Sequence, residues 1–112
     1  MEDLNEDKLA EIVIDFNELR GEQVSESMLA TFGVWTKSIL KAMFGEIKIP
    51  VSVRGNRREL AAFGNAIGRE KIYIDAARKY GLDNPRTYKN KAKLTKAIKD
   101  FERKTGLKWP VK

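Results

Sequence analysis

Regularly spaced basic residues in the C-terminal half are the side chains best suited to binding a ligand. The set consists of Lys89, Lys93, Lys96, Lys99 and Arg103. On a helical wheel these residues lie opposite the apolar stripe that contains Leu94, Ile98 and Phe101. Lysines at this spacing repel one another and do not stabilise a helix, so an anionic partner would relieve the repulsion. Phosphates suit such a face, because they accept point-charge contacts without base-specific geometry. The alternative is an ordinary solvated helix face.

A second basic cluster surrounds a turn. Arg54, Arg57 and Arg58 flank Gly55 and Asn56, where a strand end, a turn and a helix N-terminus are predicted to meet. Backbone N–H groups and arginines at such a place bind phosphate or carboxylate. The spacing matches neither a P-loop nor GxGxxG. Ordinary capping beside exposed arginines is the simpler explanation, and the cluster is kept as an auxiliary part of the predicted site.

Aromatic residues lie among the basic ones. Tyr88 and Trp109 are the two that we consider for stacking on bases, which contributes about 1–3 kcal/mol per base in single strands. Rings that close the edge of a small core, with polar tips in water, are the favoured alternative.

The composition argues against an enzyme. The chain contains no cysteine and no histidine, which excludes disulfides, thiolate nucleophiles and zinc–thiolate sites and removes the usual general base. Glu70 falls on the apolar face of the helix predicted for residues 57–80, where burial could raise its pKa for acid/base chemistry. No motif places a second carboxylate beside it, so the sequence predicts no catalytic residue, no metal site and no cofactor.

The charge is divided unevenly along the 112 residues. Residues 1–50 carry a net charge of −5 and residues 51–112 carry +11. Such asymmetry indicates binding to nucleic acid or another anionic surface, or association of opposite ends, unless two charged faces of one fold attract each other. No apolar run approaches the roughly 18–20 residues that span a bilayer, and the acidic N-terminus is unlike a signal peptide. We expect no membrane association and a cytoplasmic location.

The pattern of apolar residues predicts a mainly helical α+β fold with four to five helices. Helices are expected at 7–20, 25–44, 57–80 and 89–104. The 57–80 segment is either one helix or two helices divided at Gly64 and Gly68, and a kink near Gly68 is favoured. Residues 12–14 could instead form a strand. Residues 47–53 alternate as an edge strand, whose partner is 11–16, another chain or the tail at 107–111. The tail is favoured because Trp109 and Val111 alternate with lysines.

The length suits a single domain over residues 1–112. It would comprise an acidic helical half, 1–46, and a basic strand–helix–helix half, 47–112.

Two segments carry resemblances. The helix end Ala76–Leu82, the connector Asp83–Lys89 and the segment Lys91–Ile98 resemble the helix–extended–helix layout of SAP-type DNA-binding modules, with a longer connector. The segments Tyr80–Tyr88 and Phe101–Pro110 are similar to small phage-encoded proteins. That resemblance implies a viral accessory protein that is nucleic-acid associated, a virion component or a host-factor binder, located in the host cytoplasm or the virion.

Together these features predict non-enzymatic binding of a DNA or RNA backbone through the basic residues named above. The alternative is an interaction or assembly module. Such a module would use its charge-segregated surfaces, or its 47–53 strand, to bind an acidic protein or another copy of the chain.

Overall fold

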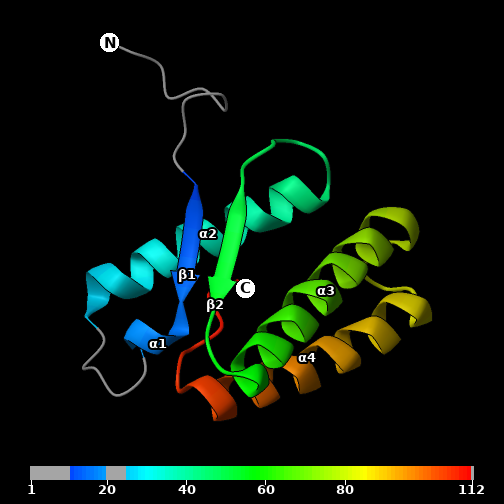
Figure 1. Cartoon of the computed structure of the whole chain (residues 1–112). Coiled ribbons are helices and arrows are strands. Elements are labelled where there is room, and N and C mark those ends of the chain that lie inside the picture. The colour runs from blue at the N-terminus through cyan, green and yellow to red at the C-terminus, as the bar shows by residue number, and fades with distance from the viewer. Residues whose placement is uncertain (1–10, 20–24, 112) are drawn as a thin grey trace. The chain divides into compact units, whose positions relative to one another are not determined.

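The computed structural model describes residues 11–19 and 25–111, and it confirms a mainly helical α+β fold (Figure 1). The elements are β1 (Ile12–Asp15), α1 (Phe16–Leu19), α2 (Glu26–Met43), β2 (Val51–Arg54), α3 (Arg57–Tyr80) and α4 (Pro85–Thr105). They form two compact units, Met1–Asn56 with Pro110–Lys112, and Arg57–Trp109. The predicted single domain stays a prediction, and the acidic segment 1–7 lies outside the described residues.

The first unit contains a two-stranded parallel sheet. Ile12 pairs with Val51 and Asp15 pairs with Arg54, and α1 and α2 form the crossover that a parallel connection needs. The strand at Val51–Arg54 is therefore shorter than the predicted 47–53. Its partner is β1, within residues 11–16, which is one of the three partners considered from the sequence. The favoured pairing with the tail at 107–111 is wrong, because Leu107 and Trp109 are buried in the second unit.

The predicted helix at 7–20 is wrong over residues 12–15, and among the described residues it is helical at Phe16–Leu19. Residues 7–10 and Arg20 lie outside the described part of the chain. Ile12 and Ile14 are both buried, at the period of two that a strand gives. The β-branched run favours a strand once a partner strand is available. Glycine commonly ends helices, and Gly21, which is expected to end this one, lies outside the described residues.

Helix α2 covers the sheet and begins where Ser25 or Ser27 is expected to act as the cap, and Ser25 is the cap. The Ser25 side chain accepts a hydrogen bond from the Met28 backbone N–H at 3.2 Å, which satisfies one of the free donors of the first turn. Phe32 of α2 meets Phe16 edge to face, with ring centroids 6.1 Å apart. The core of this unit therefore lies between α2 and the α2-facing side of β1.

The second unit is a pair of antiparallel helices (Figure 1). Helix α3 runs through Gly64 and Gly68 without interruption, so the segment is one helix and is not divided in two. Its buried face, which includes Phe63 and Ile67, packs on α4, where the ring of Phe63 lies 6.1 Å from that of Phe101, centroid to centroid. Packing of this long apolar face offsets the roughly 1 kcal/mol that each helical glycine costs relative to alanine.

A tight connection joins the two helices. Gly81 adopts a left-handed φ of 86°, and the Asn84 side chain caps α4 by accepting from the Arg86 N–H at 2.9 Å. The buried Thr87 hydroxyl donates to the Gly81 carbonyl at 2.7 Å. Helix α4 therefore begins at Pro85, four residues before the predicted start at Lys89.

Candidate nucleic-acid interface

A groove of about 600 Å³ lies along the α3–α4 pair. Polar and charged side chains of both helices line it: Asn65 and Arg69 from α3, and Lys93, Lys96, Lys99, Asp100 and Arg103 from α4. We call this set the basic groove. Five of its side chains are cationic and one is anionic, which gives a net formal charge of +4.

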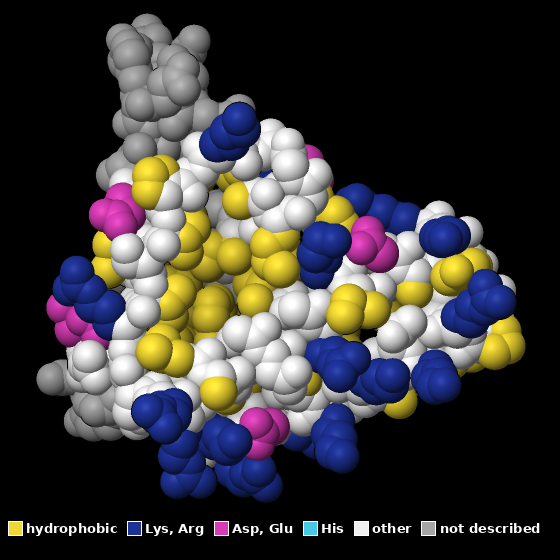
Figure 2. Space-filling model, turned by 45° about the vertical axis from the view of Figure 1, so that its right-hand side comes forward, with side chains coloured by type: hydrophobic (Ala, Val, Ile, Leu, Met, Phe, Trp, Pro, Cys, Tyr) yellow, Lys and Arg dark blue, Asp and Glu magenta, His cyan; other side chains and the backbone are white. Residues whose placement is uncertain are grey.

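The position of the lysines follows from how α4 packs. Leu94, Ala97 and Phe101 are buried, so the opposite side of the helix faces solvent. Lys93, Lys96 and Lys99 are all exposed there. Figure 2 shows Lys and Arg side chains gathered over the lower part of the visible face, with few acidic side chains among them.

Asp100 is the carboxylate of the groove, and it is already paired. Its carboxylate lies 2.6 Å from Arg103 and 3.2 Å from Lys104. Hydrogen bonds from Lys104 first, and then from Arg103, lower the pKa of Asp100. Among the described residues no acidic side chain pairs with Lys93, Lys96 or Lys99, so these three cations face solvent without a counter-charge there.

The groove brings together part of the predicted site. Lys93, Lys96, Lys99 and Arg103 line it. Lys89 is exposed on the same helix, one turn before Lys93, but does not line the groove.

The arginine cluster is not part of the groove. Arg57 and Arg58 are exposed at the start of α3, and Arg54 ends β2 in the first unit. The predicted cooperation of Arg54 with the α4 lysines stays a prediction.

Sequence reasoning missed Arg69. It lies on α3, four residues after Asn65, and both face the groove. The i, i+4 spacing of two polar residues places them on one helix face. Assigning that face to a groove requires knowing that α4 packs beside it.

The two aromatic candidates differ in accessibility. Tyr88 is 56% exposed on α4 and stays a candidate for stacking. Trp109 is only 7% exposed, and its ring lies 5.1 Å from Phe101 and 6.0 Å from Phe63, centroid to centroid. This corrects the predicted stacking role of Trp109, because its ring faces belong to the core.

Glu70 is the acidic partner of that tryptophan. The indole N–H of Trp109 donates to the Glu70 carboxylate at 2.8 Å, while the Trp109 backbone N–H donates to Glu102 at 2.9 Å. Glu70 is 4% exposed. Burial raises the pKa of Glu70 and the hydrogen bond from Trp109 opposes that rise. Glu70 therefore helps to hold the tail against α3.

The raised pKa of Glu70 makes stability depend on pH. Because the folded state holds this proton more tightly than the unfolded state, stability falls as pH rises from the ordinary value of 4.5 through the folded pKa. Glu70→Gln removes the ionisation and keeps a carbonyl acceptor for the indole. We expect the variant to gain stability relative to the parent as pH rises through this window, measured by urea unfolding at several pH values.

Leu82→Ala, which truncates a side chain that is 63% exposed and carries no ionisable group, is the control for that pH series. Its stability relative to the parent is expected to stay nearly constant over the same window. A difference between Glu70→Gln and the parent that does not change with pH would contradict the assigned role of burial.

The described residues were also searched for metal-binding groups and for membrane-spanning helices. No group of three or more acidic side chains in residues 11–19 and 25–111 is arranged to hold a metal ion. In the same part of the chain, no helix combines the length and the apolar character that crossing a membrane would need.

Comparison with protein-family models, curated proteins and solved structures found no match to this chain. The resemblances described above stay predictions.

Proposed function

We propose that this protein binds the phosphate backbone of nucleic acid through the basic groove, without covalent chemistry. The observation that carries the proposal is the convergence of five cationic side chains from two helices on one open groove whose carboxylate is already paired. Arg69 adds a bidentate donor from α3 to the lysines of α4.

The lysine-bearing segment of α4 is long enough to follow a strand of nucleic acid over several phosphates. From Lys93 to Arg103 the α4 axis advances about 15 Å at 1.5 Å per residue. That length corresponds to about four nucleotides along one strand of a duplex. The lysines offer point charges rather than base-reading pairs, so the proposal is for sequence-independent binding to DNA or RNA.

The experiment is a salt titration of binding. Fluorescence anisotropy with a labelled random-sequence duplex would give the dissociation constant at several salt concentrations. If four phosphates are contacted, the slope of log affinity against log salt is expected near −0.9 per contact, or about −4 in total. Affinity that does not change with salt, or no binding at low salt, would contradict the proposal.

Parallel titrations with single-stranded DNA and RNA would identify the nucleic acid. Tyr88 lies on α4 one residue before Lys89 and is exposed. If its ring stacks on a base, Tyr88→Ala is expected to weaken single-strand binding by about 1–3 kcal/mol and to leave duplex binding nearly unchanged.

A further inference from the structure

The parallel sheet of the first unit has only two strands within residues 11–19 and 25–111. Parallel strands usually form part of larger, covered sheets, and two strands alone are marginally stable. Each strand of such a pair keeps an outer edge, where unpaired N–H and C=O groups can join another strand. The outer edge of β1 is the one of interest, because a pocket lies beside it.

The register shows which backbone groups face outward. The Ile12 N–H donates to the Pro50 carbonyl at 2.9 Å, and Ile12 is paired with Val51. In a parallel ladder, alternate residues bond to the same neighbour. The N–H and C=O groups of Ile12 and Ile14 therefore point to β2, whereas both groups of Val13 and the N–H of Asp15 point away from it. The C=O of Asp15 belongs to the start of α1.

An open pocket of about 250 Å³ lies against this outer edge. Three consecutive strand residues, Val13, Ile14 and Asp15, line it. Successive strand residues point to opposite faces of a sheet, so a pocket that touches all three runs along the strand edge. Its other side is formed by α2, which contributes Phe32 and Trp35.

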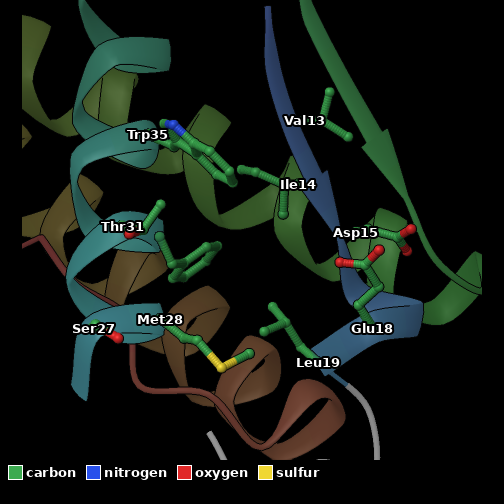
Figure 3. Close-up of a pocket in the computed structure, with 10 residues that line it drawn as sticks. Val13, Ile14, Asp15, Glu18, Leu19, Ser27, Met28, Thr31 and Trp35 are labelled. Atoms are coloured by element: carbon green, nitrogen blue, oxygen red, sulfur yellow. The ribbon is translucent and has the colours of Figure 1, made fainter. Parts of the chain in front are cut away.

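Apolar and acidic groups occupy different sides of the pocket. Figure 3 shows Ile14 pointing toward Trp35, with Met28 and Leu19 further along the same side. Val13 points the other way, and the carboxylates of Asp15 and Glu18 lie close together on its side of the strand (Figure 3).

Strand β2, which already pairs with β1, indicates which side chains a strand on the outer edge of β1 would need. Val51 and Val53 of β2 lie opposite Ile12 and Ile14, on the apolar face, while Arg54 lies opposite Asp15. A strand on the outer edge meets the same two faces of β1. It would place apolar side chains toward Trp35 and alternate basic side chains toward the carboxylates.

We propose that the outer edge of β1 binds an extended segment of a partner protein as a third strand, and that this segment alternates apolar and basic residues. Backbone hydrogen bonds to Val13 and Asp15 supply affinity, and the pocket and the carboxylates of Asp15 and Glu18 select the side chains. This interaction is separate from the basic groove, since it uses residues of the other unit.

The probe is a seven-residue peptide that alternates valine and lysine, with blocked ends. Titrated into the full chain and followed by NMR, it is expected to shift the amide signals of Val13 and Asp15 and to slow their hydrogen exchange. The signals of α4 serve as an internal reference and are expected to stay unchanged. A peptide of the same length that alternates valine and glutamate is the charge control, and its affinity is expected to be at least about tenfold lower.

Two variants separate the backbone contribution from the charge contribution. Val13→Pro removes an outward N–H while leaving the hydrogen bonds between β1 and β2 in place, and it is expected to abolish peptide binding. Glu18→Lys changes an exposed side chain outside the sheet and is expected to weaken binding of the valine–lysine peptide about tenfold or more. The same change is expected to strengthen binding of the valine–glutamate peptide.

Three outcomes would overturn the proposal. The first is slow exchange of the Val13 and Asp15 amides in a monomeric free chain, which would mean that another segment of the same chain covers the edge. The second is self-association that protects these amides without peptide, which would make a second copy the occupant. The third is equal binding of both peptides to the parent and to Glu18→Lys.

Discussion

Replacing Trp109 by alanine is expected to lower the free energy of unfolding by about 3–5 kcal/mol. The indole packs against Phe63 and Phe101, and its removal leaves a cavity in a small core. It also deprives the buried Glu70 carboxylate of its hydrogen-bond donor, and an unsatisfied buried acceptor costs about 1–3 kcal/mol. Urea unfolding followed by circular dichroism measures the loss.

Two further substitutions calibrate that result. Trp109→Phe keeps an aromatic ring but removes the N–H, so it is expected to lose less than the alanine variant. Tyr88→Ala truncates an aromatic residue that is 56% exposed, and its effect is expected within about 0.5 kcal/mol. If Trp109→Ala and Tyr88→Ala cost the same, Trp109 does not hold the α3–α4 core together.

The second prediction concerns the basic groove. Replacing Lys93, Lys96 and Lys99 together by alanine is expected to make the salt dependence of nucleic-acid binding less steep by about 2 to 3 in slope, near one unit per lost phosphate contact. Affinity at low salt is expected to fall by about one to two orders of magnitude. All three side chains are exposed, so the helix and its stability are expected to be retained.

A matched triple variant tests whether position or net charge matters. Lys41, Lys91 and Lys108 are exposed and lie outside the basic groove. Their joint replacement by alanine removes the same charge, and it is expected to change the slope much less. Equal losses in the two triple variants would show that binding depends on overall charge alone, and would refute the groove as the site.

The helices were the predictable part of the fold. The long apolar periods of α2, α3 and α4 predict amphipathic helices, and Ser25 was one of two serines expected to cap α2. The lysine face of α4 was equally readable, because the same periodicity that buries Leu94 exposes Lys93 and Lys96. The local pattern of residues is enough to predict which face of a single helix is buried and which is exposed.

What the sequence did not reveal depends on partners distant along the chain. Ile12–Ile14 fits a helix or a strand until Val51–Arg54 is known to pair with it. Trp109 follows a lysine in an alternating tail, yet its ring is buried against two phenylalanines, and Glu70, 39 positions away, accepts its N–H. Arg69 joins the groove only through the packing of α3 on α4. The sequence therefore predicted the α4 residues of the groove, but not those that α3 contributes.

The late position of Trp109 has a consequence for synthesis on the ribosome. Helices α3 and α4 can form and begin to pair as they emerge, but the indole that completes their core follows α4 itself. Until residue 109 leaves the exit tunnel, Phe63 and Phe101 lack that cover and Glu70 lacks its donor. A hairpin of α3 and α4 that lacks residue 109 therefore leaves part of its apolar surface uncovered.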